Sequence, residues 1–234
     1  MRGADFFYIS ALSTYLAHTG TCYSAVMKRG KLISFVGGEG SGKTTCIKKL
    51  QAHHPVDEII FTREPGGTEL AEKVRDMFLN FELNLFEEFL AVQIARSIHF
   101  REKINPALQQ GLHVVTDRCY ESTWAYQIVA GGNHDTRLKK LFEETNNLAC
   151  DGTEVDLFID FHIDVEKSLL RKHGGDEAVN RFDTLPLQYH YAVRAGFDDF
   201  LSQPHIKHKV VKVNADDDEH TLASEVATIL KNHL

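Results

Sequence analysis

Short apolar runs alternate along this chain with longer stretches in which apolar residues recur every three or four positions. The longer spacing is clear in Leu70, Val74, Met77 and Phe78, and it predicts amphipathic helices. The apolar runs are typical of buried strands, and they cover residues 31–36, 57–62, 111–117, 155–161 and 208–213. Because strands alternate with helices, the pattern predicts an α/β fold with a parallel sheet and helices on both faces.

Candidate capping residues mark where several of the helices begin. Thr68 is followed by acidic residues in the first helical turn, and Asp135 and Asp164 precede two further helices. The polar, glycine-bearing stretch 173–183 predicts a mobile loop. The predicted helices cover residues 45 to about 53, 69–78, 85–110 with a kink near Pro106, 119–130, 136 to about 149, 165–172, 185–201 and 219–233.

The stretch from Gly37 to Thr44 carries the strongest chemical signature. It reads Gly-Gly-Glu-Gly-Ser-Gly-Lys-Thr, which fits the phosphate-binding pattern G-x-x-x-x-G-K-T between a strand and a helix. Backbone N–H groups of such a loop surround phosphate oxygens, Lys43 reaches the terminal phosphates and the Thr44 hydroxyl holds Mg²⁺. The loop members before them are Gly37, Gly38, Glu39, Gly40, Ser41 and Gly42. The stretch therefore predicts that a nucleoside triphosphate and Mg²⁺ bind here.

Arginines at strand ends predict a second phosphate site beside this loop. Arg63 follows the strand 57–62, and Asp117-Arg118 ends the strand 111–117. Because the carboxyl ends of parallel strands meet at one edge of the sheet, these residues converge with the phosphate loop on one crevice. The planar guanidinium binds phosphate oxygens with two parallel hydrogen bonds. Further candidates are Arg96, Arg171 and Arg181, although Arg171 has a solvent-facing position on its helix as an alternative.

Composition limits the class of ligand and compartment. The formal net charge of −7 over 234 residues excludes a nucleic-acid surface as the expected partner, so a local basic cluster suits a small anion. The four cysteines lack metal or C-x-x-C spacing, as expected for reduced thiols in the cytoplasm, and no apolar stretch is long enough to cross a membrane.

We expect residues 27–234 to form one domain. Residues 1–26 form a dispensable extension in this interpretation, with Met27 as the functional start.

The order of motifs resembles the thymidylate kinase family of P-loop nucleoside monophosphate kinases. The resemblance is carried by the Phe61–Thr68 stretch, by Asp117-Arg118 followed by Ser122–Gln127, and by the phosphate loop with Glu39 inside it. It implies a three-layer sandwich around a five-stranded parallel sheet, with a small lid at about 173–183. It also implies transfer of the γ-phosphate of ATP to dTMP, giving dTDP for dTTP synthesis, by a Mg²⁺-dependent cytoplasmic homodimer.

The resemblance assigns roles to individual residues. On the donor side, Lys43, the loop amides and Arg171 bind ATP, and Thr44 holds Mg²⁺ with Asp117 near the metal. On the acceptor side, Glu39 accepts from the sugar 3′-hydroxyl, Arg63 and Arg118 clamp the 5′-phosphate, and Arg96 lines the base side. Gln127 hydrogen-bonds the thymine edge. Its neighbours in the acceptor pocket are Ser122, Thr123 and the sugar-shaping Tyr126.

The source of transition-state charge follows from what the phosphate loop lacks. Members of the family place this basic residue either in the phosphate loop or in the lid. No basic residue precedes Lys43 in this loop, so the resemblance implies a cation from the lid, where Arg171 and Arg181 are the candidates. We expect Arg181, which stands in the sequence Asn180-Arg181-Phe182-Asp183 and resembles the family's lid arginine.

One departure from the family pattern concerns base recognition. The family places a phenylalanine four residues before the arginine of the long helix, and here that position is Val92. This leaves dUMP or a modified deoxypyrimidine monophosphate as an alternative acceptor. A P-loop regulatory GTPase is a second alternative, against which stands the absence of an N-K-x-D motif. For the homodimer, we expect a face of the 85–110 helix to form the interface.

Overall fold

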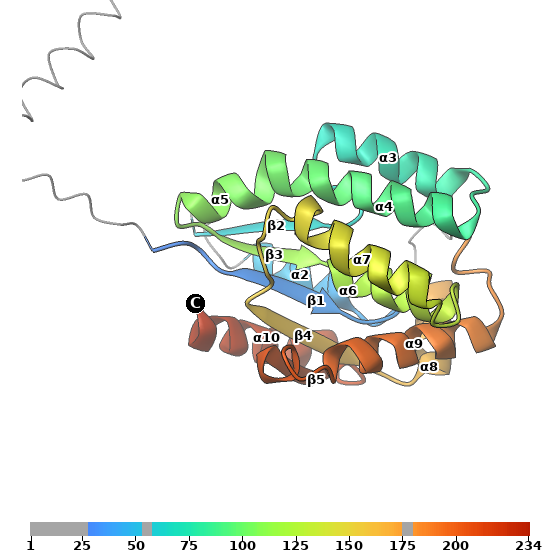
Figure 1. Cartoon of the computed structure of the whole chain (residues 1–234). Coiled ribbons are helices and arrows are strands. Elements are labelled where there is room, and N and C mark those ends of the chain that lie inside the picture. The colour runs from blue at the N-terminus through green and yellow to red at the C-terminus, as the bar shows by residue number, and fades with distance from the viewer. Residues whose placement is uncertain (1–27, 53–57, 175–179) are drawn as a thin grey trace, which may run out of the picture.

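The structure is a computed structural model that describes residues 28–52, 58–174 and 180–234 (Figure 1). The predicted extension 1–26 lies outside the described residues, as does the central part of the predicted lid 173–183. No helix within the described ranges combines the length and apolar character that crossing a bilayer requires.

The sheet confirms the predicted parallel fold. Its strands lie in the order β2-β3-β1-β4-β5, and every neighbouring pair is parallel. The central strand β1 is buried along its whole length, as expected for a strand covered by helices on both faces. The strand bounds are β1 Leu32–Val36, β2 Ile59–Arg63, β3 His113–Asp117, β4 Leu157–His162 and β5 Val210–Asn214.

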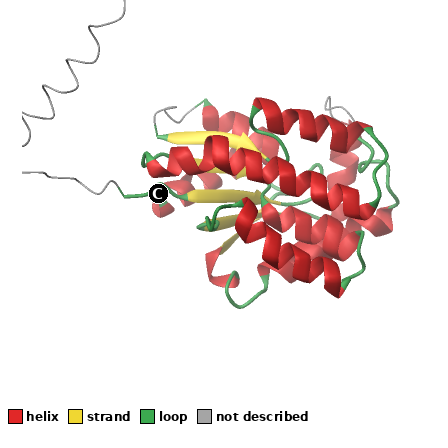
Figure 2. Ribbon diagram, turned by 45° about the horizontal axis from the view of Figure 1, so that its top comes forward, coloured by secondary structure: helices red, strands yellow, loops and turns green. Residues whose placement is uncertain are grey.

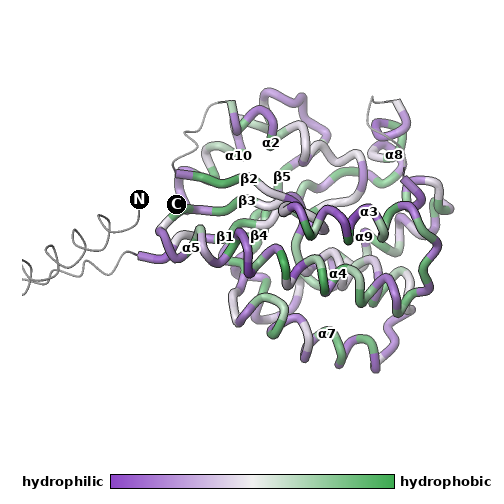
Figure 3. Tube along the Cα trace, turned by 90° about the horizontal axis from the view of Figure 1, so that it is seen from above, coloured by the Kyte–Doolittle hydropathy of each residue, from purple (hydrophilic) through white to green (hydrophobic). Residues whose placement is uncertain are grey.

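Helices cover both faces of the sheet and form the outer layers of a three-layer sandwich (Figures 2 and 3). One face packs against α2 and α10 through a core that includes Phe35, Ile159 and Val226. The other packs against a larger set of helices around Phe158, Phe100 and the neighbouring side chains. The helix bounds are α2 Lys43–Gln51, α3 Glu69–Asn80, α4 Leu85–His99, η1 Phe100–Ile104, α5 Asn105–Gln109, α6 Tyr120–Thr123, η2 Trp124–Ala130, α7 Thr136–Ala149, α8 Val165–Gly174, α9 Leu187–Leu201, η3 Lys207–Lys209 and α10 Glu219–His233.

The predicted helix caps are present. The Thr68 side chain accepts from the Ala71 N–H at the start of α3, and the Asp135 carboxylate accepts from the Arg137 N–H at the start of α7. Asp164 accepts from the Lys167 N–H before α8. Each cap satisfies a backbone donor that the helix itself leaves unpaired.

The long helix 85–110 differs from the prediction in how it bends. Its regular part ends at His99, and a π-helical turn, η1, follows before Pro106. The Asn105 N–H donates to the Phe100 carbonyl, five residues back, and Pro106 lies in the first turn of α5. Because proline lacks an N–H and crowds the carbonyl four residues before it, a wider turn at this point accommodates the ring.

Candidate active site

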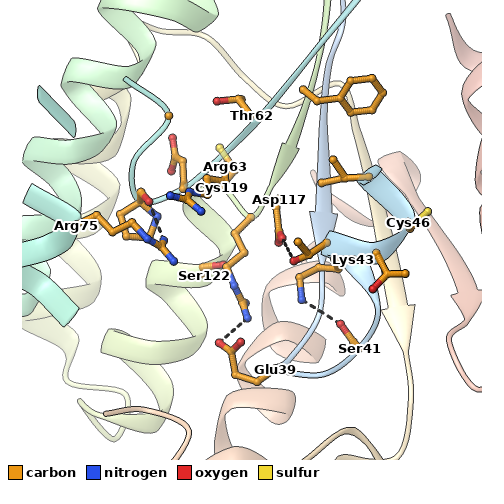
Figure 4. Close-up of a pocket in the computed structure, with 18 of the residues that line it drawn as sticks. Glu39, Ser41, Lys43, Cys46, Thr62, Arg63, Arg75, Asp117, Cys119 and Ser122 are labelled. Carbon is orange, nitrogen blue, oxygen red and sulfur yellow. Dashed lines mark hydrogen bonds and ion pairs between the residues drawn. The ribbon is translucent and has the colours of Figure 1, made fainter. Parts of the chain in front are cut away.

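A large pocket lies where the carboxyl ends of β1, β2 and β3 meet. Its volume is about 1650 Å³, which exceeds the roughly 300–1,000 Å³ of a site for one small ligand. Figure 4 shows Lys43 and Ser41 on one side of it, Arg63 and Arg75 on the other, and Asp117 between them. The structure thus brings together the motifs that the sequence predicted to converge.

The phosphate loop connects β1 to α2 and has a conformation that requires glycine. Gly40 has a φ of +69°, and a Cβ there would lie 1.9 Å from the Ser168 carbonyl oxygen of α8, so no larger side chain fits. The Lys43 Nζ donates to the Gly37 and Gly38 carbonyls at 3.0 and 2.8 Å and to Ser41 Oγ at 3.0 Å. The lysine therefore also braces the loop from inside.

Thr44 and Asp117 form the part of the pocket suited to a metal ion. The Thr44 hydroxyl donates to Asp117 Oδ2 at 2.9 Å. The other carboxylate oxygen, Oδ1, is buried and finds no hydrogen-bond partner within the described part of the chain. No cluster of three or more candidate metal ligands occurs among the described residues. This donor set fits Mg²⁺, which takes one or two protein oxygens and fills its octahedron with phosphate oxygens and water.

Glu39 and Arg118 form an ion pair at the centre of the pocket. Arg118 Nη2 donates to Glu39 Oε1 at 2.8 Å, and the Tyr126 hydroxyl donates to the same oxygen at 3.1 Å. Burial alone would raise the pKa of Glu39, but Arg118, Lys43, Lys172 and the Tyr126 hydrogen bond together lower it to about 2. Glu39 is therefore ionised at neutral pH and accepts hydrogen bonds.

The backbone of Arg118 has an unusual conformation that aims its side chain at the phosphate loop. Its φ is +71°, in the left-handed region that non-glycine residues rarely adopt. The conformation is held by Arg118 N–H donating to the Phe35 carbonyl at 3.0 Å, and by Thr116 Oγ1 donating to the Arg118 carbonyl at 2.7 Å. The guanidinium then reaches the Gly37 carbonyl at 2.8 Å as well as Glu39.

Arg75, which no motif of the sequence indicated, lines the same pocket as Arg63. Arg63 is half exposed and pairs with Glu72 at 2.8 Å, whereas Arg75 donates to the Pro65 carbonyl at 2.8 Å. Burial and repulsion by Arg63 and Arg118 lower the pKa of Arg75, and such mutual repulsion indicates a site for an anion. Helical spacing could have indicated Arg75, because it stands four residues after Ala71 and three before Phe78, on the face of α3 that is buried.

Arg96 lines the pocket and is enclosed in a network of buried polar side chains. Its guanidinium donates to Glu64 at 2.9 Å, to Gln93 at 2.7 Å and to Thr123 Oγ1 at 3.0 Å. Only 2% of the side chain is exposed. The network holds Arg96 in one orientation at the edge of the cavity.

The other residues assigned to the acceptor side line this end of the pocket. Ser122, Thr123, Tyr126 and Gln127 all contribute to its wall. The Gln127 amide donates to Glu88 Oε2 at 3.3 Å.

The lid-side cations occupy different places. Arg171 lines the pocket and donates to the Ala215 carbonyl at 2.6 Å. Lys172, which sequence analysis did not single out, is buried, lines the pocket and contributes to lowering the pKa of Glu39. Arg181 is not among the described residues that line the pocket: its guanidinium contacts Glu88 Oε1 at 2.6 Å and donates to the Phe78 carbonyl at 3.1 Å.

The known proteins to which this chain is similar all belong to one family. The family model for thymidylate kinase matches residues 35–221. A thymidylate kinase from Bacillus pumilus is 36% identical over 182 residues, which cover 74% of this chain and 83% of the relative. One from Clostridium novyi is 33% identical over 211 residues, 88% of this chain and 100% of the relative. The crystal structure of a thymidylate kinase from Ehrlichia chaffeensis superposes with a TM-score of 0.65 at 29% identity, covering 87% of this chain and 99% of that one.

Glu121, directly behind the pocket, is a buried carboxyl group without a counter-charge in hydrogen-bonding contact among the described residues. Its Oε1 accepts from Ser34 Oγ at 3.1 Å and from the Cys119 N–H at 2.7 Å. Oε2 is buried and finds no hydrogen-bond partner in the described ranges. Burial raises the pKa of Glu121 from 4.5 to about 7, although the hydrogen bonds oppose the shift.

We predict that Glu121→Gln changes the pH dependence of stability. Because the folded-state pKa lies above the unfolded value, the stabilisation by protonated Glu121 is present below about pH 4.5 and is lost as pH rises through about 7. The variant should match the wild type at pH 4 and exceed its free energy of unfolding at pH 8 by about 3 kcal/mol. Urea unfolding at both pH values measures this. The exposed Glu225→Gln is the control, and equal pH dependence of wild type and Glu121→Gln contradicts the prediction.

Proposed function

This chain belongs to the thymidylate kinase family and phosphorylates dTMP, and we propose that ATP is the donor and that Mg²⁺ assists the transfer. The observation that carries the proposal is the pairing of two anion-binding sets in one pocket. Lys43 and the phosphate loop form one set, and Arg63, Arg75 and Arg118 form the other. The volume of about 1650 Å³ accommodates two nucleotides.

The charges of the pocket suit phosphoryl transfer between two anions. The reaction needs donor and acceptor phosphates in line and their repulsion cancelled, with little covalent work by the protein. The acceptor phosphate is itself an oxygen nucleophile that carries negative charge at neutral pH, so no general base is required. Glu39, with a pKa of about 2, serves instead to orient Arg118 and to accept from the sugar 3′-hydroxyl.

In this proposal the acceptor nucleotide is held along its whole length. Arg118, Arg63 and Arg75 bind its 5′-phosphate, and Tyr126 shapes the sugar pocket. Arg96 and Gln127 bind the base edge, and the hydroxyls of Ser122 and Thr123 complete this wall. The buried network around Arg96 supports such a role because it fixes the guanidinium, the hydrogen-bond donor, in place before the nucleobase binds.

On the donor side, Lys43, the loop amides and Arg171 bind the ATP molecule in this proposal. Thr44 would hold Mg²⁺, and Asp117 would bind it through water; Asp117 Oδ1 has no hydrogen-bond partner within the described residues. When bound, the ion neutralises charge on the donor phosphates.

The free, buried thiols of Cys46, Cys119 and Cys150 suit a reducing compartment, and we place the reaction in the cytoplasm.

A panel of acceptors with ATP and Mg²⁺ tests the proposed function. We expect dTMP to be preferred over dUMP by tenfold or more in kcat/KM, about 1.4 kcal/mol. Coupled detection of ADP measures the rates. Equal use of dUMP would support the alternative acceptor suggested by Val92. Hydrolysis of the triphosphate without dependence on any monophosphate would instead favour a switch protein.

We propose that Arg181 supplies the transition-state charge, which requires that it leave Glu88 and the Phe78 carbonyl when nucleotides bind. Arg181→Ala should lower kcat about a thousandfold, the scale of an arginine finger, with a smaller change in KM for ATP. Steady-state kinetics of Arg181→Ala and Lys172→Met provide the measurement. A loss in kcat confined to the Lys172 variant would transfer the role to Lys172, which lies closer to the phosphate loop in this structure.

We also propose that the enzyme is a homodimer formed through α3 and α4. These helices pack side by side and expose a ridge of large apolar side chains. On α4, Phe86, Leu90 and Ile94 are 50%, 42% and 53% exposed and recur every four residues. Leu70 and Met77 of α3 and Phe81, the residue that follows α3, are also exposed, and we assign them to the same ridge. Exposed apolar side chains on two packed helices suit an interface, and a second copy of the chain provides a matching ridge.

Charged substitution on the ridge should separate the subunits. The double variant Leu90→Glu, Ile94→Glu should have half the molar mass of the wild type in sedimentation equilibrium, because two charges would be buried in the interface. Leu170→Glu is the control, since Leu170 is 74% exposed on α8, which packs against α9 and lies apart from α3 and α4 (Figure 1). A monomeric wild type at the same concentration would rule out the dimer.

A further inference from the structure

An aromatic pair borders the pocket beside Val92, the position where the sequence departs from the family pattern. Phe182, in the turn between α8 and α9, and Phe78, on α3, have ring centroids 5.2 Å apart and an interplanar angle of 26°. Both rings pack in one cluster with Ala91 and Val92 of α4. Phe78, Val92 and Phe182 all line the pocket. The Phe78 and Phe182 rings therefore lie beside Val92, whose side chain is smaller than the phenylalanine of the family pattern.

The turn that carries Phe182 is fixed by its own hydrogen bonds. The Phe182 N–H donates to Asn180 Oδ1 at 2.9 Å, and the Asn180 N–H donates to Asp183 Oδ2 at 2.8 Å. The Leu185 N–H donates to the Phe182 carbonyl at 3.2 Å. The ring is thus held against α3 and α4 by a locally ordered turn, with only 6% of the residue exposed.

Phe182 also contacts the residues that define the acceptor side. Its ring meets the Tyr126 ring edge to face, at 5.9 Å and 86°, and Tyr126 hydrogen-bonds to Glu39. The Arg181 guanidinium lies 4.2 Å from the Phe182 centroid. The ring is therefore at the base end of the acceptor pocket, next to the side chains assigned to the sugar.

We propose that Phe182, supported by Phe78, forms the aromatic wall of the nucleobase pocket in place of an aromatic side chain at position 92. A nucleobase gains affinity by contact with an aromatic ring whatever element of the fold supplies it. The wall comes from the turn Asn180–Leu185 before α9, so base recognition depends on this turn as well as on α4. This inference rests on the proposed function, because it concerns how the acceptor base is selected.

The test combines variants at both positions with two acceptors. Phe182→Ala should raise KM for dTMP about tenfold, lower the preference for dTMP over dUMP, and change KM for ATP less than twofold. Phe182→Leu keeps most of the volume without the aromatic ring and should show the same direction of effect. Val92→Phe in the Phe182→Ala background should recover most of the lost dTMP affinity. Val92→Phe alone should give no more than a twofold gain, because the space is already filled.

Controls separate this inference from simple loss of structure and from failure of the proposed function. Leu185→Ala, in the same turn but outside the pocket lining, should keep KM for dTMP within twofold of the wild type, and thermal melting reports folding of each variant. A KM for dTMP that is unchanged or lower in both Phe182 variants overturns the inference, the latter because Phe182 would then block the pocket. A wild type that does not phosphorylate dTMP instead refutes the proposed function itself.

Discussion

The ion pair between Glu39 and Arg118 is the interaction on which the geometry of the pocket depends. It joins the loop after β1 to the residue after β3, and the same guanidinium also holds the Gly37 carbonyl. Arg118 adopts a backbone conformation that costs free energy, and the parallel pairing of β1 with β3 holds it there. Breaking the pair would leave a partly buried, uncompensated charge, so the pair fixes the phosphate loop and Arg118 relative to each other.

Much of the fold was predictable from the sequence because its signals are local. The apolar runs gave strands whose ends shift by only a few residues, as in β2, predicted at 57–62 and found at Ile59–Arg63. Thr68, Asp135 and Asp164 cap helices as expected. The π-helical turn before Pro106 was not predictable, because its hydrogen bonds depend on how the chain packs around it rather than on residue type.

The candidate site was predictable where residues follow strand ends and less so where they sit on helices. Gly37–Thr44, Arg63 and Asp117-Arg118 meet because parallel strands place their carboxyl ends together. Arg75 and Lys172 gave no motif signal, since a cation on a helix is most often exposed to solvent. The position of Phe182 beside Val92 arises from tertiary packing between segments about 90 residues apart, which periodicity does not report.

The contact between Gly40 and α8 has a mechanical consequence. A Cβ on Gly40 would lie 1.9 Å from the Ser168 carbonyl oxygen, so the phosphate loop and the backbone of α8 touch without room for an intervening side chain. Because α8 also carries Arg171 and Lys172, which line the pocket, this contact sets how far these two cations stand from the phosphate loop. Any side chain larger than hydrogen at position 40 would therefore move the loop and the two cations apart.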